Sequence, residues 1–286
     1  FENDNQSIDQ VALEEQKIQK HKEPPIEDLE FLINLYSEGE FTEALSLINE
    51  LLDQFPYSMD LYNIAGASNA GLRKFDASIN NYQQAIKINP NFADAHNNIG
   101  NAFLEKGELD EAIANYKQAT LINPEYFEAY LNLGNALMDK GMQDEAIDNY
   151  KEAIKINPNL AIAYYLIANA FKSKGDLKNA ITNYKKATLI YPDYTEAYVN
   201  LGNVLMGKGM LDEAIDNYKQ AIIINPDYAD AFNNLGNALQ VKGDLEEAID
   251  NYKQAIIINP DYAEAFNNLG SALRGISMLD EAIDNY

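Results

Sequence analysis

Seven prolines of this chain stand 34 residues apart, and each closes a stretch with the same pattern of apolar residues. They are Pro56, Pro90, Pro124, Pro158, Pro192, Pro226 and Pro260. A fixed period of this length indicates an array in which every unit has the same fold. Because each unit of such an array buries its apolar surface against its neighbours, the period predicts a repeat architecture rather than one large core.

Placing each proline at position 32 of its unit divides residues 25–286 into an array that follows a tail over residues 1–24. The tail is rich in Gln, Glu, Lys and Asn, and it is interpreted either as solvated chain or as a short amphipathic helix. The units of the array are 25–58, 59–92, 93–126, 127–160, 161–194, 195–228, 229–262 and an incomplete 263–286.

Each unit carries two helical patterns. Positions 4, 7, 8 and 11 are apolar or small, as in Tyr130, Leu133, Gly134 and Leu137, and at about 100° per residue they share one helix face. Positions 20, 24 and 27 form the corresponding face of a second helix. The pattern predicts an all-α chain in which each unit is a helix, a turn, a second helix and an Asn-Pro stop.

Glycine marks the turn between the two helices of a unit, at position 15, where a left-handed residue commonly follows a helix. Two units carry the glycine at position 13 instead, as Gly71 and Gly275, and their first helices are predicted to end early. The glycines at position 15 are Gly39, Gly107, Gly141, Gly175, Gly209 and Gly243.

Small residues at positions 8 and 20, with tyrosine at position 24, complete the pattern, as in Gly202, Ala214 and Tyr218. This arrangement resembles the tetratricopeptide repeat (TPR), and the resemblance covers residues 25–286. It implies a right-handed superhelical solenoid of antiparallel helix pairs, with the first helices lining a concave groove. The chain stops at Tyr286, inside a second helix, and we expect Ile283 and Tyr286 to be covered by residues beyond it.

The charge balance restricts the partners. With 21 Lys and Arg against 45 Asp and Glu, the formal net charge is −24, which argues against nucleic acid and anionic membrane surfaces. A protein or peptide partner that is extended and neutral to basic is expected instead. No apolar run approaches the roughly 20 residues needed to span a membrane. A cytoplasmic location is expected, and a periplasmic or secreted one stays open because residue 1 is Phe.

No residues form a recognisable catalytic or metal site, and no cofactor is expected. The chain has no cysteine, and its two histidines, His21 and His96, are isolated. Acidic pairs such as Asp110-Glu111 recur at the starts of second helices, where they favourably meet the helix dipole. Periodic carboxylates of this kind indicate a structural role rather than acid–base catalysis.

The best candidate site is a double row of asparagines opposite the packing face of the first helices. Asparagine is a mediocre helix former, and its amide can both donate to and accept from the backbone of an extended peptide. The row at position 6 resembles the asparagine ladder in the repeat region of O-linked N-acetylglucosamine transferases, which implies a peptide-binding groove. Asparagine also recurs at position 23 of second helices, so part of its periodicity belongs to the unit itself. The rows are Asn98, Asn132, Asn200, Asn234 and Asn268 at position 6, and Asn101, Asn135, Asn169, Asn203 and Asn237 at position 9.

The unit 161–194 departs from the pattern on the same face. Ile162, Tyr165 and Leu166 replace acidic, mixed and asparagine residues, and Lys172 lies close by in sequence. Apolar residues beside basic ones predict an anchor for a partner side chain or for a second copy of the chain. Drift in one unit, with these residues packing on their neighbours, is the alternative.

Three functions are compatible with these features. The leading hypothesis is a non-enzymatic scaffold whose groove binds an extended polypeptide or organises an assembly. The alternative is the substrate-docking arm of a larger glycosyltransferase or sulfotransferase with its catalytic domain beyond residue 286, because the opening PPIEDLEFLINLYSEGEFTEAL resembles repeats of such bacterial proteins. The third is homo-oligomerisation, in which the acidic surface of one copy meets the unit 161–194 of another.

Overall fold

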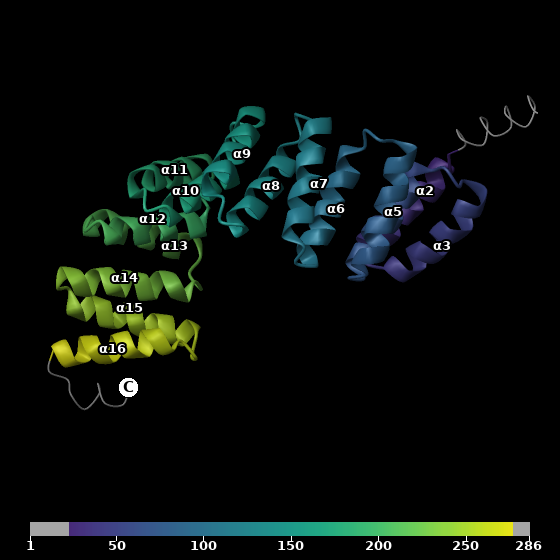
Figure 1. The fold of residues 1–286 in the computed structure, drawn as a ribbon. Coiled ribbons are helices and arrows are strands. Elements are labelled where there is room, and N and C mark those ends of the chain that lie inside the picture. Colours follow the sequence, from purple (N-terminus) through teal and green to yellow (C-terminus); the bar gives the residue numbers. More distant parts are fainter. Residues whose placement is uncertain (1–22, 277–286) are drawn as a thin grey trace, which may run out of the picture. The chain divides into compact units, whose positions relative to one another are not determined.

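The computed structural model describes residues 23–276, and the expected tail helix and the last second helix lie outside this range. The described part is built from α-helices without strands, which confirms the all-α prediction (Figure 1). The helices are α2 (Ile26–Ser37), α3 (Phe41–Gln54), α4 (Met59–Gly71), α5 (Phe75–Ile88), α6 (Ala93–Glu105), α7 (Leu109–Ile122), α8 (Phe127–Asp139), α9 (Gln143–Ile156), α10 (Ala161–Ser173), α11 (Leu177–Ile190), α12 (Thr195–Gly207), α13 (Leu211–Ile224), α14 (Ala229–Lys242), α15 (Leu245–Ile258) and α16 (Ala263–Gly275).

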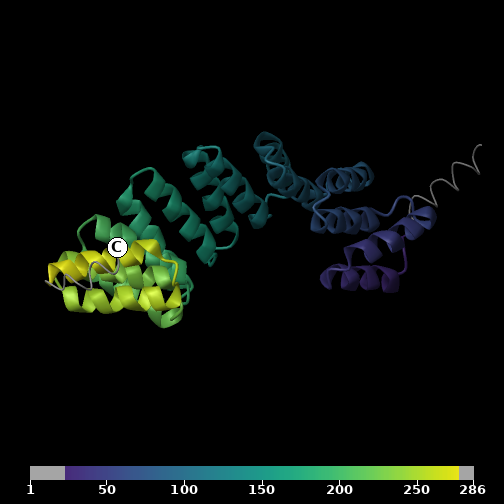
Figure 2. The same ribbon diagram turned by 90° about the horizontal axis from the view of Figure 1, so that it is seen from below.

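The helices form two compact units, of which one ends at Met142 and the other begins at Gln143. Within each unit, every helix packs on the helices before and after it in sequence, as the views in Figures 1 and 2 show for α14, α15 and α16. First helices of successive repeats also contact each other, as α12 and α14 do, whereas second helices do not approach each other as closely in the described chain. The first helices therefore form the inner face of each unit, and the second helices form the outer face.

A tyrosine at position 24 is the centre of the described helix pairs from α4 and α5 onward, whereas the pair of α2 and α3 has Ile48 there. Tyr116, Tyr218 and Tyr252 are fully buried, and their rings lie directly on the glycine at position 8 of the partner helix. A Cβ atom on Gly202 would lie only 2.5 Å from Cε1 of Tyr218. The absence of a side chain at position 8 therefore makes room for the ring, as the sequence pattern predicts, and the two helices pack closely around it.

The turn glycines adopt the predicted left-handed conformation. All six glycines at position 15 have positive φ, between 73° and 99°. The prediction that Gly71 and Gly275 shorten their helices is wrong, because α4 and α16 end at position 13 like most other first helices. In α4 the glycine instead makes room for the Phe41 ring, from which a Cβ would lie 2.6 Å away. The left-handed turn then falls on Arg73, with φ 56°.

Alanine at two glycines of the same turn is expected to change stability in opposite directions. Gly207 ends α12 without a positive φ, Gly209 has φ +73°, and a Cβ at either position would meet nothing within 4 Å. Gly207→Ala should raise the free energy of unfolding by about 0.5–1 kcal/mol, because alanine favours the helix and restricts the unfolded chain. Gly209→Ala should lower it by about 1–2 kcal/mol, since φ remains positive. Urea denaturation followed by circular dichroism measures both, and equal signs would contradict the conformational argument.

Asparagine at position 31 explains the Asn-Pro stop. The side-chain Oδ1 of Asn123 accepts a hydrogen bond from the backbone N–H of Glu125, at 3.0 Å, and so bridges the proline between them. Asn89, Asn225 and Asn259 make the same bond two residues ahead. The chain therefore turns from the second helix of one repeat into the first helix of the next without a side-chain cap on that helix.

Ion pairs link successive repeats on the outside of the array, between a lysine at position 14 and an aspartate at position 18 of the preceding repeat. Lys106 pairs with Asp76 at 2.8 Å, and Lys242 pairs with Asp212 at 2.8 Å. Lys140 with Asp110 and Lys174 with Asp144 repeat the arrangement. In the unit 161–194 the aspartate is replaced by Lys178, so Lys208 lacks this partner.

Candidate functional site

The asparagines at position 6 tie neighbouring first helices together. Nδ2 of Asn132 donates to Oδ1 of Asn97, and Nδ2 of Asn268 donates to Oδ1 of Asn233, both at 3.0 Å. The acceptor stands at position 5 of the preceding repeat in each case. Each of these amides therefore uses its N–H group inside the protein and leaves its half-buried oxygen on the inner face.

The asparagines at position 9 hold the buried tyrosines. The hydroxyls of Tyr116, Tyr184, Tyr218 and Tyr252 donate to Oδ1 of the asparagine fifteen residues earlier in the chain, at 2.5–2.8 Å. The acceptors are Asn101, Asn169, Asn203 and Asn237. Because Oδ1 faces the tyrosine, the Nδ2 group of each amide is directed away from it and stays available as a donor.

The two rows thus present opposite ends of the amide. The described part of repeat 263–286 offers only the oxygen of Asn268, because its position 9 is Ser271, whereas repeat 195–228 offers the N–H group of Asn203. Asn98 and Asn234 make no side-chain hydrogen bond within the described residues, and in the repeat before Asn234 the position of the usual acceptor is the apolar Val199. Asn135 belongs to the same row at position 9 and is exposed.

The asparagines at position 23 have a different role, which separates them from the candidate site. Nδ2 of Asn115 donates to the carbonyl oxygen of Glu111, at 2.9 Å, and Asn217 and Asn251 bond in the same way to the residue one turn back. These amides are satisfied within their own helices. Only the rows on the first helices are therefore candidates for ligand contacts.

In the unit 161–194 a tyrosine and a lysine make the polar contacts between first helices that asparagines make elsewhere. Tyr165 takes the place of the asparagine at position 5, and its hydroxyl accepts from Nδ2 of Asn200 at 3.0 Å. Lys172 donates to Oδ1 of the same Asn200, also at 3.0 Å. The Tyr165 ring is half-buried and lies 5.0 Å from the ring of Tyr194. Tyr165 and Lys172 are therefore joined in one network, as the sequence interpretation grouped them.

The two aliphatic residues of the predicted anchor patch are only partly exposed. Ile162 is 37% exposed and Leu166 is half-buried on the same helix, α10. The following helix, α11, has no acidic residue in its first turn. Asp176 caps this helix, and its hydrogen bonds from Asn179 hold the pKa of its carboxyl below the ordinary value.

A hollow of about 550 Å³ opens on the inner face between α4 and α6. It brings Asn98 and Asn101 together with three aromatic residues, Tyr36, Phe75 and Tyr82. The sequence reasoning placed these two asparagines in the groove but did not predict the hollow beside them. The signal was present in α4, where alanine and glycine stand at positions that carry larger residues elsewhere.

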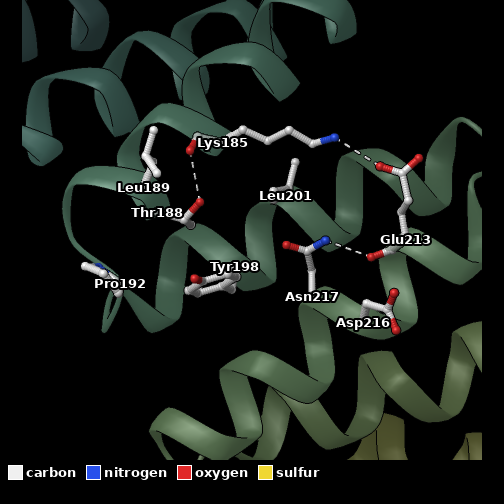
Figure 3. Close-up of a pocket in the computed structure, with 9 residues that line it drawn as sticks. All are labelled: Lys185, Thr188, Leu189, Pro192, Tyr198, Leu201, Glu213, Asp216 and Asn217. Carbon is white, nitrogen blue, oxygen red and sulfur yellow. Dashed lines mark hydrogen bonds and ion pairs between the residues drawn. The ribbon is translucent and has the colours of Figure 1, made fainter.

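A second pocket, of about 590 Å³, lies on the outer face, and the sequence reasoning missed it (Figure 3). Lys185 reaches across the top of it to Glu213, at 3.0 Å, while Leu189, 80% exposed, stands at its edge. Tyr198 also lines it. Thr188 lines the pocket where the next two repeats have isoleucine, and the smaller side chain is the signal that could have indicated it.

None of the described helices combines the length and apolar character required to cross a membrane. Residues 23–276 contain no group of three or more His, Cys, Asp and Glu side chains placed to hold a metal ion.

Comparisons with known proteins agree with this geometry. A curated relative, the probable UDP-N-acetylglucosamine–peptide N-acetylglucosaminyltransferase SEC of Arabidopsis thaliana, is 37% identical over 73 residues, which are 26% of this chain and only 8% of that protein. Among solved structures, MamA is 31% identical with a TM-score of 0.54, over 58% of this chain and 97% of MamA. YrrB, described as a TPR protein with an unusual peptide-binding site, is 29% identical with a TM-score of 0.55, over 64% of this chain and 95% of YrrB.

A family model described as TPR repeat matches in overlapping segments that together run through most of the array. The segments are 73–107, 100–141, 134–175, 168–209, 202–242 and 240–274. With the helix pairs, the turn glycines and the tyrosine–glycine packing, this match shows that the chain belongs to the tetratricopeptide-repeat family.

Proposed function

We propose that this chain is a protein-interaction scaffold whose inner face binds an extended polypeptide through the polypeptide's backbone. The observation that carries the proposal is the division of labour between the two asparagine rows. At position 6, Asn132 and Asn268 leave their amide oxygens on the inner face, whereas the oxygen of Asn200 accepts from Lys172. At position 9, asparagines such as Asn203 leave their amide N–H groups there. An extended backbone presents both donors and acceptors along its length, so it matches such a surface whatever its side chains are.

The charge of the chain narrows the partner further. A net charge of −24 favours a neutral or basic polypeptide and disfavours an acidic one, with an effect that weakens as salt increases. YrrB, described as a TPR protein with a peptide-binding site, resembles this chain over 95% of its own length and supports a polypeptide partner. Binding a polypeptide through these residues requires no catalytic group in this chain.

Replacing the donors of position 9 while keeping their structural role is the direct test. Asn203→Asp together with Asn237→Asp keeps an acceptor oxygen for Tyr218 and Tyr252 but removes both inner-face N–H groups. With a lysine-flanked Gly-Ser peptide carrying a fluorescent label, anisotropy at low salt should show at least tenfold weaker binding, since two hydrogen bonds are lost.

The matched control adds the same two negative charges elsewhere in the same repeats. Gln220→Glu with Gln254→Glu places them on the second helices, and its affinity should stay within about twofold of the original after the same change in net charge. Equal weakening in both double variants would indicate a charge effect alone, and unchanged binding by the asparagine variant would contradict the proposal. Failure of the unmodified protein to bind the probe would contradict it as well.

The similarity to the Arabidopsis transferase favours a second candidate function. The same inner face would then hold a polypeptide substrate for a catalytic domain elsewhere in a longer protein. Sequencing the gene beyond the codon for Tyr286 tests this. A glycosyltransferase or sulfotransferase domain in the same reading frame would support the substrate-docking function. A stop codon or a capping repeat would rule that function out.

A further inference from the structure

The alanines that shape the hollow between α4 and α6 are not found at the same positions of the other repeats. Its α4 wall is made by Ala67, Ala70 and Gly71. At the position of Ala70, α8 carries Met138 and α12 carries Met206. The missing side-chain volume accounts for an open space of about 550 Å³ on an inner face that is otherwise lined by longer residues.

Aromatic rings of α2 and α5 form a second wall, and residues of α6 form a third. Tyr82 is 3% exposed, and its ring lies on Gly66, where a Cβ would come within 2.6 Å. Tyr36 is 40% exposed and its ring centroid is 5.4 Å from that of Phe41. Burial raises the pKa of the Tyr82 hydroxyl well above its ordinary value, so this wall is neutral at physiological pH. The hollow is therefore a rigid aromatic pocket rather than a soft gap between helices.

Polar and charged residues also line the hollow, namely Arg73, Asn98, Asn101 and Glu105. The guanidinium of Arg73 lies 3.5 Å from the Glu105 carboxylate and 5.6 Å from the centre of the Phe75 ring. Asn101 uses Oδ1 for Tyr116 and keeps its N–H group available. Because Arg73 is paired with Glu105, the hollow offers no unbalanced charge to a charged side chain, whereas a neutral ring can pack on its aromatic and alanine residues.

Repeat 93–126 also differs from its neighbours in the state of its position 6 amide. By the spacing of the other cross-repeat bonds, Asn98 should donate to Asn63, yet Oδ1 of Asn63 is buried without a partner and Asn98 makes no hydrogen bond within the described residues. Both the oxygen and the N–H group of the Asn98 amide, beside the hollow, are therefore free to bind a ligand. A backbone held by Asn98 and Asn101 would run along the mouth of the hollow.

We infer that this hollow is a side-chain pocket that gives the inner face its sequence preference, and that it takes an aromatic side chain of the bound polypeptide. The inference rests on the proposed function, because the backbone contacts bring the side chain to the pocket. The backbone rows alone cannot distinguish one sequence from another. The pocket adds that distinction at one place along the bound chain, between repeats 59–92 and 93–126.

The absence of tryptophan from the chain allows a direct test. Two lysine-flanked Gly-Ser peptides are compared, one with a central Trp and one with Ala, and the Trp emission is excited selectively. The Trp peptide should bind about tenfold more tightly, as expected for partial burial of a large ring, and its emission should shift to shorter wavelength. Competition against the same labelled Gly-Ser peptide gives both affinities on one scale.

Ala70→Met fills the pocket with the residue that α8 and α12 carry in the same register, so the fold should tolerate it. The preference for Trp over Ala should fall from about tenfold to about onefold, while the affinity for the Ala peptide stays unchanged. Ala114→Met, at an exposed site of α7, is the control and should leave the preference unaltered.

The outcomes separate the two proposals. Equal binding of both peptides by the unmodified protein would overturn the pocket and leave the backbone proposal intact. A Trp preference that survives in Ala70→Met would overturn the location. If neither peptide bound, both proposals would be overturned. If Ala70→Met changed the molecular mass measured by sedimentation, the pocket would be assigned to a second copy of the chain instead.

Discussion

Replacing Tyr218 by alanine is expected to lower the free energy of unfolding by about 3–5 kcal/mol, the range for removing a large buried ring from a core. The ring is fully buried between α12 and α13, lies directly on Gly202, and its hydroxyl donates to Asn203 at 2.7 Å. Alanine leaves a cavity that the helix pair cannot close without losing contacts on both sides. Urea denaturation followed by circular dichroism at 222 nm measures the loss.

Two control variants measure the contribution of the Tyr218 hydroxyl and the effect of a substitution at an exposed site. Tyr218→Phe removes only the hydroxyl and should lower the free energy of unfolding by about 1 kcal/mol, because the exposed Asn203 can turn to water. Ile223→Ala, one turn further along α13 at 69% exposure, should change it by less than about 0.5 kcal/mol. If Tyr218→Ala cost no more than Tyr218→Phe, the ring would not be the centre of the helix pair.

Alkaline pH is expected to unfold the array steeply. Burial raises the pKa of the hydroxyls of Tyr82, Tyr116, Tyr184, Tyr218 and Tyr252 well above the ordinary value of about 10. The folded state therefore keeps protons that the unfolded state releases, so stability is complete below pH 10 and decreases above it. Each tyrosine contributes about 1.4 kcal/mol per pH unit, and five together about 7 kcal/mol per pH unit.

Absorbance at 295 nm and circular dichroism, recorded on the same samples from pH 9 to 12, test this expectation. The tyrosinate signal of the buried residues should appear in the same narrow interval in which the helical signal disappears. Tyr218→Phe should make that transition less steep by about one proton. Gradual ionisation near pH 10 with an unchanged helical signal would show that the hydroxyls are accessible in the folded chain.

The fold was predictable because the period, the turn glycines and the tyrosines each act within one repeat or between adjacent repeats. The left-handed conformation of Gly209 and the ring of Tyr218 over Gly202 follow from residue spacing alone. Gly71 shows where this reasoning fails. Its role depends on the Phe41 ring of the preceding repeat, and a sequence pattern does not reveal how close that ring comes.

The hydrogen-bonding roles of the candidate asparagines could not be predicted from the sequence, and their contact with a ligand stays a prediction. Counting positions placed Asn132 and Asn203 on the inner face, yet only the distances show that one uses its N–H group and the other its oxygen. The pockets are harder still to predict, because Ala70 and Thr188 matter through the volume they leave empty. Missing volume is not visible in a pattern of hydrophobic and polar residues.

The polar bonds between adjacent repeats join residues that are close along the chain. The amide bonds from position 6 span 35 residues, the outer ion pairs from position 14 span 30, and the pair of Lys185 with Glu213 spans 28. Adding a repeat therefore closes a loop of nearly constant length, and the entropy lost is nearly the same at every step. Folding within a unit can begin at any helix pair and spread in both directions, without waiting for a distant segment. The same independence lets a repeat be copied without rebuilding the rest, as the identical segments 213–229 and 247–263 suggest.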